Sequence, residues 1–216
     1  MLDIERNKPG TSATGHNIAG LSRANGNNAA ALIEEVDGRR QRVISALARE
    51  VAIRDARDDD AEGLTRIVAA ITAEFPGCVF DLDADFPELK QPKSSFEAED
   101  GRFWVAEAQV VNAGSRASEI VGCCGFLPAE DPDGVELLRV YLRPDLRGSG
   151  LALKMFKIVQ AVARQRGASF IELWTDSRFK AAQRFYEKLG FTRQPGERLL
   201  NDRSRSSEYQ YLLPLR

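Results

Sequence analysis

One stretch decides the fold of this chain: Leu138-Arg139-Val140-Tyr141-Leu142-Arg143-Pro144-Asp145-Leu146-Arg147-Gly148-Ser149-Gly150-Leu151-Ala152. A strand pattern passes through a glycine loop into a helical pattern. The first N–H groups of a helix lack internal partners and lie at the positive end of its dipole, so an anion placed there accepts several hydrogen bonds. Gly148 and Gly150 remove side chains that would block a close approach, and Arg147 adds a positive charge.

The pattern of this loop narrows the choice of anion. A nucleotide-binding Walker loop needs Gly-Lys followed by Ser or Thr, which is absent here. A dinucleotide fingerprint needs a small residue three positions after Gly150, where Leu153 stands. What remains, Arg-x-x-Gly-x-Ala over residues 147–152, resembles the pattern that known proteins use for the pyrophosphate of coenzyme A. The alternative is an ordinary glycine turn before a helix.

Periodicity elsewhere predicts a mixed α/β domain. The order is a strand, helices, a run of antiparallel strands, then helix, strand, helix and strands. Strands are expected near residues 51–54, 102–109, 119–127, 135–142, 169–174, 191–192 and 208–213, and helices after Asp60, from the glycine loop to Arg166, and from Asp176 to Leu189. Residues 78–100 carry too many turn residues and acids for an assignment.

Two segments resemble a known family. The stretch quoted above looks like motif A of the GNAT superfamily of N-acetyltransferases, and Ala182-Gln183-Arg184-Phe185-Tyr186-Glu187-Lys188-Leu189-Gly190-Phe191 resembles its motif B. The similarity covers about residues 51–213. It implies a central, mostly antiparallel twisted sheet of six to seven strands flanked by helices. That sheet would contain a bulge and splay between its fourth and fifth strands.

The same resemblance implies acetyl-CoA as the co-substrate and no metal. The pantetheine arm would lie in the splay and pair with the main chain near Val140 and Leu142, with the pyrophosphate on residues 147–152. The implied cofactor-binding residues are Val140, Leu142, Arg147, Gly148, Ser149, Gly150, Leu151, Ala152, Phe179 and Phe185. Many members carry Asn where this chain has Phe179, so one cofactor hydrogen bond is in doubt.

Two residues are predicted to be catalytic. Tyr186 matches the family's general acid; a tyrosine has an ordinary pKa of about 10 and a thiol about 8.5, so a tyrosine can protonate a leaving thiolate. The alternative for Tyr186 is an aromatic that only packs in the core. Glu136 resembles a base that takes a proton from the amine, often through water, and burial would raise its pKa usefully. The alternatives are a solvated strand residue or a partner of Arg139.

The predicted function is transfer of the acetyl group of acetyl-CoA to a primary amine of a small molecule, by direct attack in a ternary complex. A protein or peptide acetyltransferase and a catalytically silent acetyl-CoA sensor are the alternatives. An acetyl-cysteine intermediate on Cys123 or Cys124 is disfavoured, since no histidine is available to activate it. Acceptor selectivity is assigned to residues 75–100, where the acids favour a cationic amine or simply form a solvated loop.

Length, net charge, hydropathy and cysteine count argue against nucleic-acid-binding, membrane and secreted proteins. The chain has 216 residues and a formal net charge of −2, which disfavours nucleic-acid binding. No apolar run approaches a membrane span, no signal peptide is recognised, and an odd count of 3 cysteines favours the cytoplasm. The domain division expected is a flexible tail at 1–28, a helical extension at 29–50 and the acetyltransferase domain at 51–216. That extension could pack on a second subunit, which leaves a homodimer open.

Overall fold

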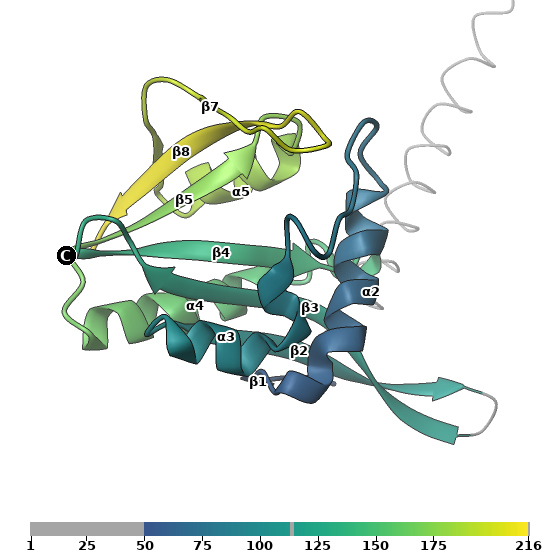
Figure 1. Ribbon diagram of the computed structural model, residues 1–216. Helices are drawn as coiled ribbons and strands as arrows, with labels where there is room; N and C mark the ends of the chain where they lie inside the picture. Colours follow the sequence, from purple (N-terminus) through teal and green to yellow (C-terminus); the bar gives the residue numbers. More distant parts are fainter. Residues whose placement is uncertain (1–49, 113–114, 216) are drawn as a thin grey trace, which may run out of the picture. The chain divides into compact units, whose positions relative to one another are not determined.

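The computed structural model describes residues 50–112 and 115–215, all within one compact unit (Figure 1). The tail predicted for residues 1–28 and all but Glu50 of the helical extension predicted for 29–50 lie outside the described residues. The strands of the described region are β1 Val51–Asp55, β2 Arg102–Asn112, β3 Ser115–Pro128, β4 Gly134–Leu142, β5 Phe170–Asp176, β6 Thr192–Arg193, β7 Arg198–Leu199 and β8 Ser207–Pro214. Its helices are α2 Ala61–Thr72, α3 Pro92–Ala98, α4 Leu151–Gln165 and α5 Lys180–Lys188, with short 3₁₀ turns η1 Asp58–Asp60, η2 Pro87–Lys90 and η3 Pro144–Leu146.

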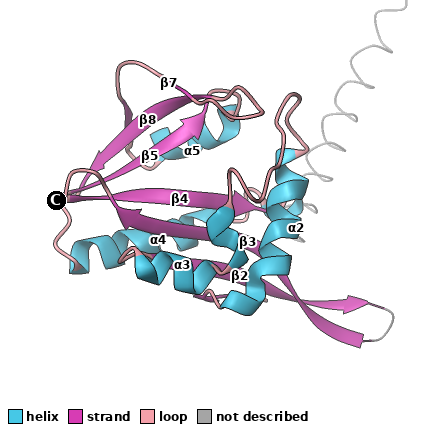
Figure 2. Cartoon of the chain, viewed as in Figure 1, coloured by secondary structure: helices cyan, strands magenta, loops and turns pink. Residues whose placement is uncertain are grey.

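The strands form one sheet in the order β1-β2-β3-β4-β5-β8-β6, with β7 also paired to β8 (Figure 2). Every pairing is antiparallel except that of β4 with β5. The predicted mixed α/β class and mostly antiparallel sheet are therefore confirmed. The strand number reaches eight because β6 and β7, of two residues each, join six longer strands.

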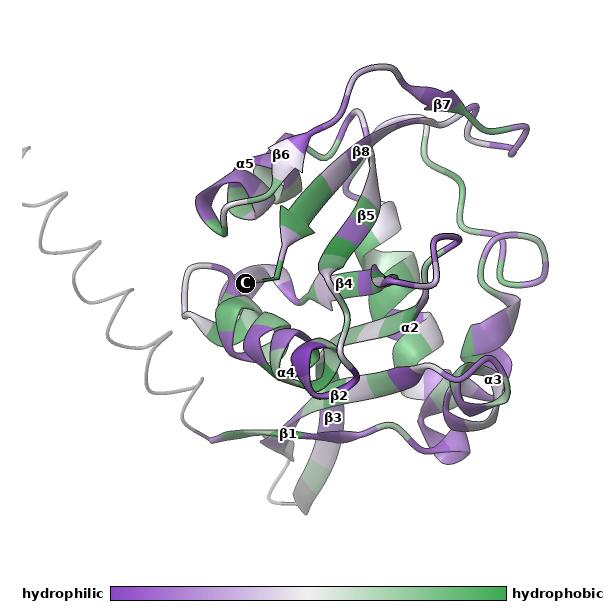
Figure 3. Cartoon of the chain, turned by 90° about the vertical axis from the view of Figure 1, so that its left-hand side faces the viewer, coloured by the Kyte–Doolittle hydropathy of each residue, from purple (hydrophilic) through white to green (hydrophobic). Residues whose placement is uncertain are grey.

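Helices cover both faces of the sheet. α2 and α3 pack on one face, where Leu64, Val68 and Phe96 belong to one buried cluster. α4 packs on the other, where Met155 and Val159 belong to a second cluster. Figure 3 shows apolar and polar residues alternating along α4, and the residues of α4 that are buried are all apolar. The apolar stripes of α2 and α4 are therefore the inner faces of these helices.

β4 carries the predicted bulge. Cys123 of β3 pairs with Tyr141 and Gly125 pairs with Leu138, so two residues of β4 lie opposite Cys124 alone. Arg139 takes a left-handed backbone conformation there, with φ of 55°. An extra residue bends its strand and increases the local twist, which turns the end of β4 away from its neighbour.

The predicted splay between the fourth and fifth strands is also confirmed. β4 and β5 pair only where Gly134, Val135 and Glu136 face residues 170–172. Beyond Glu136 the two strands separate. β5 and β8 stay paired and diverge together from β4, as a separate arm of the sheet (Figure 1). The edge of β4 that faces β5 therefore has no strand partner from Leu137 onward.

The segment that the sequence left unassigned, residues 78–100, contains η2 and α3. Both begin with proline, which suits the first turn of a helix because its N–H has no acceptor there. Leu89 and Phe96 anchor them in the core, with 0% and 2% of each residue exposed. With four and seven residues, these helices are too short to show a clear periodicity.

Candidate active site

A cavity of about 410 Å³ lies where β4 and β5 separate. β4 supplies one wall, β5 supplies Trp174, and α5 with the residue before it supplies Phe179, Ala182 and Tyr186. Four of the predicted site residues meet here: Glu136, Val140, Phe179 and Tyr186. These residues lie up to 50 positions apart in the sequence. They line a single pocket because the splay places α5 opposite the end of β4.

Tyr186 is buried, with 7% of the residue exposed, and its ring packs against those of Phe185, Phe191 and Tyr211. Within the described part of the chain its hydroxyl has no hydrogen-bond partner, yet that oxygen is not sealed from solvent. Burial raises the pKa of Tyr186 above its ordinary value, and the Tyr141 hydroxyl and Cys124 thiol raise it further. The hydroxyl therefore stays protonated and faces the cavity as a donor.

Glu136 is half-buried on β4, at the last residue pair before β4 and β5 separate. We call this point of separation the fork. Burial raises the pKa of its carboxyl, Arg198 and Arg139 lower it, and the carboxylates of Glu172 and Glu208 raise it. Neither a salt bridge nor a hydrogen bond engages the Glu136 side chain among the described residues. Its predicted alternative as a partner of Arg139 is wrong, because Arg139 binds Glu88 with Nε and Oε1 2.6 Å apart.

The glycine loop has the conformation that an anion site needs. Gly148 and Gly150 have φ of 80° and 84°, and a Cβ added at either would meet nothing within 4 Å. Gly150 is the N-cap of α4 and carries no capping side chain, while the Ser149 hydroxyl accepts the N–H of Leu151 at 3.2 Å. The open space in front of the helix start fits a pyrophosphate bound by main-chain N–H groups.

Arg147 is engaged by a residue far away in sequence. Its guanidinium makes two hydrogen bonds to the carboxylate of Glu74, of 2.7 and 2.8 Å. Glu74 lies just after α2, and the next residue, Phe75, packs its ring against Phe179 with centroids 4.3 Å apart. The end of α2 thus contacts both the glycine loop and the start of α5.

Four predicted cofactor residues point their side chains elsewhere. Leu142 and Leu151 are buried in the core, and Ala152 and Phe185 pack against that core. None of these four lines the cavity. Any cofactor contact from Leu142 or Leu151 must therefore come from the main chain, as predicted for Leu142.

The two adjacent cysteines are buried in β3, and their thiols are held protonated. Burial raises the pKa of Cys123 to about 12 and raises that of Cys124 further. Cys123 donates its S–H to the carbonyl of Arg139, with sulfur and oxygen 3.3 Å apart. Neither thiol lines the cavity, which agrees with the expectation that no acetyl-cysteine forms.

The sequence did not identify several residues of the cavity. Trp174 lies at the fork, and the guanidinium of Arg198 stacks over its ring, 4.1 Å from the ring centroid. Arg198 also forms an ion pair with Glu208. A roof is made by two loops, residues 78–86 and 200–206. Ser204 joins them: its Oγ accepts the N–H of Val79 at 2.8 Å. Only the position of Trp174 at the end of a buried strand could have signalled any of these residues.

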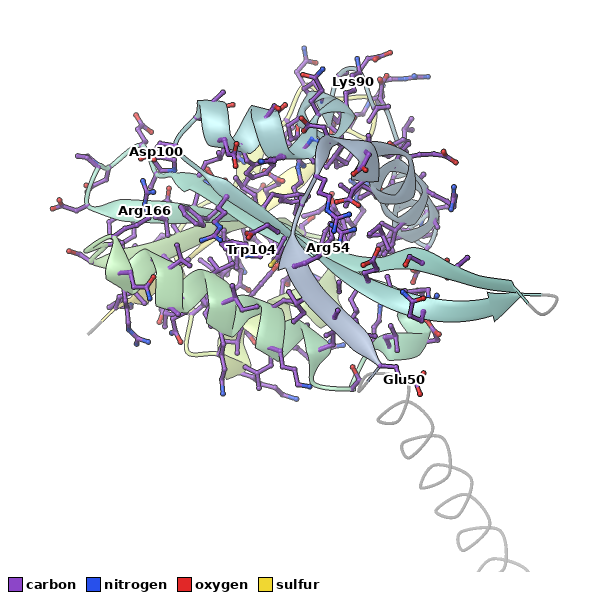
Figure 4. All side chains as sticks on the ribbon, turned by 90° about the horizontal axis from the view of Figure 1, so that it is seen from below. Glu50, Arg54, Lys90, Asp100, Trp104 and Arg166 are labelled. Atoms are coloured by element: carbon purple, nitrogen blue, oxygen red, sulfur yellow. The ribbon has the colours of Figure 1, made fainter. Side chains whose placement is uncertain are left out.

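A second cavity, of about 540 Å³, lies between β1, β2 and α3, on the side seen in Figure 4. Two of its arginines are already paired: Arg54 binds Asp60 and Glu107, and Arg102 binds Asp55. Across residues 50–112 and 115–215, no group of three or more His, Cys, Asp or Glu side chains is placed to hold a metal ion. Among the same residues, no helix has the length and apolar character needed to cross a membrane.

Comparison with known proteins agrees with this geometry. Residues 64–191 match the model of the acetyltransferase (GNAT) family. An uncharacterized N-acetyltransferase of Escherichia coli, YjgM, is 30% identical over 137 residues, covering 61% of this chain and 76% of that protein. N-acetyltransferase 8F1 of Rattus norvegicus is 30% identical over 104 residues, covering 46% of this chain. The match spans less than half of the rat protein, 43% of its length.

Solved structures share the fold. A GNAT-family acetyltransferase of Staphylococcus aureus Mu50 superposes with a TM-score of 0.62 at 22% identity, covering 77% of this chain and 99% of that one. The yncA protein of Salmonella typhimurium, solved with its cofactor acetyl-CoA, has a TM-score of 0.58 at 20% identity, covering 77% and 95%. At these identities the likeness concerns the fold.

Proposed function

Because this chain belongs to the acetyltransferase (GNAT) family and is an acetyl-CoA-dependent N-acetyltransferase, we propose that its acceptor is the primary amine of a small molecule, which attacks the thioester directly in a ternary complex. The observation that supports this most is the cavity at the β4–β5 fork, which is lined by both Glu136 and Tyr186, whose hydroxyl has no partner among the described residues. We also propose that the protein works in the cytoplasm.

The residues of the chain divide the work. The glycine loop and the start of α4 hold the pyrophosphate, and the unpaired edge of β4 holds the pantetheine arm and stabilises the developing oxyanion. Acetyl-CoA supplies the activated acetyl thioester. As the C–N bond forms and the C–S bond breaks, Glu136 takes a proton from the amine, directly or through water, and Tyr186 gives a proton to the departing sulfur.

The protonation states suit these roles. Burial keeps Tyr186 protonated, so it is available as a donor throughout the neutral range. Burial also brings the pKa of Glu136 closer to neutrality, which makes its carboxylate a stronger base than an exposed glutamate. The proposal involves no acetyl-cysteine: Cys123 and Cys124 do not line the cavity, and burial raises the pKa of Cys78, the cysteine that does line it.

The bounds of the cavity favour a small acceptor. Its volume of about 410 Å³ must hold the acyl end of the cofactor as well as the amine. Across its roof, Ser204 is hydrogen-bonded to Val79, and Arg203 pairs with Asp81 at 3.2 Å. These links limit the width of the opening, which opposes the wide, flat cleft that a folded protein substrate requires.

A thiol-release screen with acetyl-CoA tests this proposal. Small aliphatic amines, amino acids, aminoglycosides and peptides with a free amino terminus are supplied in turn, and acetylated products are identified by mass spectrometry. Turnover of small amines with little turnover of peptides supports the proposal. Turnover of peptides alone refutes the small-molecule acceptor, and cofactor binding without turnover of any amine refutes catalysis.

A further inference from the structure

The acceptor side of the cavity has an excess of negative charge. Its lining contains five carboxylates and two guanidiniums: Asp85, Glu136, Asp176, Asp202 and Glu208 against Arg139 and Arg198. Asp176 pairs with Arg178 and Glu208 with Arg198, while Arg139 is held by Glu88. Among the described residues, Asp85, Glu136 and Asp202 make no ion pair.

These three carboxylates occupy two separate positions. Asp85 and Asp202 come from the two roof loops and lie near each other, because the charge of Asp202 raises the pKa of Asp85, after burial as the largest cause. Glu136 lies at the fork instead, where its charged neighbours are Arg198, Glu172, Glu208 and Arg139. One cavity therefore has an acidic group at its reacting end and an acidic pair at its roof.

The cations near the roof pair each form an ion pair with another carboxylate, although the charges of Arg139 and Arg203 still lower the pKa of Asp85. Arg139 donates to the main-chain carbonyl of Asp85 at 2.8 Å and to the carboxylate of Glu88, and it makes no hydrogen bond to the carboxylate of Asp85 among the described residues. Arg203 is committed to the carboxylate of Asp81. Asp202 accepts the N–H of Ser206 through one oxygen, Oδ1, at 2.8 Å, which leaves the other oxygen available to a ligand.

Apolar and aromatic side chains connect the two positions. Phe86, Leu138, Val140 and Phe179 line the same cavity between the fork and the roof loops. Tyr186 lines this space as well; it is more than nine-tenths buried, and within residues 50–112 and 115–215 its hydroxyl has no partner. An acceptor that fits carries a cation at one end, an aliphatic stem, and a reactive amine at the other.

We propose that the acceptor is a dicationic aliphatic amine, a diamine or polyamine, whose second ammonium binds between Asp85 and Asp202 while its reacting amine lies at Glu136 and Tyr186. This inference rests on the proposed function and specifies the substrate class of the same site. Carboxylates without a cation in a partly buried cavity attract an ammonium, since they lose water and gain no other partner.

The test compares three acceptors of matched length with the full-length chain: 1,4-diaminobutane, n-butylamine and 4-aminobutyrate. Acetyl-CoA turnover gives kcat/KM for each. We expect the diamine to exceed butylamine by about tenfold or more, beyond the statistical gain of two equivalent ends, because one charge-assisted contact is gained. We expect 4-aminobutyrate to be the poorest, since its carboxylate would face Asp85 and Asp202.

Variants then locate the contact. Asp85→Asn and Asp202→Asn are each expected to raise KM for the diamine about tenfold with little change in kcat, because the reacting end is untouched. Asp83→Asn is the matched control: it makes the same change in the same loop, but Asp83 is exposed and pairs with Lys90 outside the cavity. Calorimetry of 1,4-diaminobutane with the enzyme–coenzyme A complex measures the contact without turnover.

The outcomes separate this inference from the proposed function. If butylamine is acetylated as well as the diamine, and the Asp85 and Asp202 variants behave like Asp83→Asn, the dicationic acceptor is refuted while the small-amine acetyltransferase stands. If acetyl-CoA binds but no amine releases thiol, both are refuted. A diamine preference lost in the two variants and kept in the control supports both.

Discussion

Replacing Tyr186 with phenylalanine removes one oxygen from the cavity and leaves the rest of the residue in place. The ring keeps its contacts with Phe185, Phe191 and Tyr211, whose centroids lie 5.6, 5.8 and 6.3 Å away. Because the hydroxyl has no partner in the described structure, its loss breaks no hydrogen bond. The free energy of unfolding should therefore change by less than about 0.5 kcal/mol.

Turnover should respond very differently. A positioned general acid contributes about 10²- to 10⁴-fold to a proton transfer, so kcat of Tyr186→Phe should fall by about 10²-fold or more. Affinity for acetyl-CoA should stay within about twofold, because the loop that holds the pyrophosphate is unchanged. Steady-state thiol release, calorimetry with acetyl-CoA and thermal unfolding measure the three quantities.

Two further tyrosines sharpen this experiment. Tyr141 also lines the cavity, and burial raises its pKa to about 12, so it is the rival donor. Tyr209 lies outside the cavity, stacked by Arg193 at 3.5 Å, and Tyr209→Phe is the matched control. If kcat of Tyr186→Phe stays within about threefold of the parent while Tyr141→Phe loses 10²-fold, the assignment of the acid to α5 is refuted.

Three other changes test the loop, the base and the end of α2. Gly150→Glu should abolish acetyl-CoA binding in calorimetry, whereas Gly167→Glu, at a φ of 80° with equal open space at the other end of α4, should retain it; normal affinity of the first variant would reject the loop as the pyrophosphate site. Glu136→Gln should lower kcat/KM and remove the acid limb of its pH profile, which in the parent falls as pH drops through a carboxyl pKa raised above 4.5 by burial. The same variant should raise the melting temperature at pH 8 and not at pH 4, since only the ionised carboxylate opposes folding; an unchanged acid limb would exclude Glu136 as the base. Glu74→Gln should release Arg147 for phosphate and tighten acetyl-CoA binding several-fold at low salt, and weaker binding would mean that the ion pair shapes the loop instead.

Most of the fold could be predicted because its boundaries are set by local chemistry. Gly148, Gly150, Gly167 and Gly190 all have positive φ and stand where α4 and α5 begin or end, as the pattern indicated. The fork of β4 and β5 was inferred from the resemblance, since no local signal encodes it. β7 was missed because a strand of two exposed residues, Arg198 and Leu199, is too short to show an alternating pattern.

The candidate site was predictable only at residues in or close to the two motifs. Tyr186 and Glu136 were assigned from the resemblance to the family, and both line one cavity in the fold. The pairing of Arg147 with Glu74 joins residues 73 positions apart, and no periodicity reports such a contact. Asp202 lies in a loop without any motif, so its meeting with Asp85 follows from the sheet order alone.

The catalytic groups and the proposed acceptor-binding carboxylates lie on different kinds of structural element, and this affects how easily acceptor choice can change. The groups assigned to catalysis stand on β4 and α5, which are fixed by core packing, whereas Asp85 and Asp202 stand on loops fixed by polar links. Ser204 bonds the main chain of Val79, and the N–H of Ser206 bonds Asp202. A carboxylate on such a loop can be replaced without opening a cavity in the core, so its substitution should change KM far more than stability. Specificity for the distal cation is therefore separable from the fold in this chain, and the asparagine variants measure that separation directly.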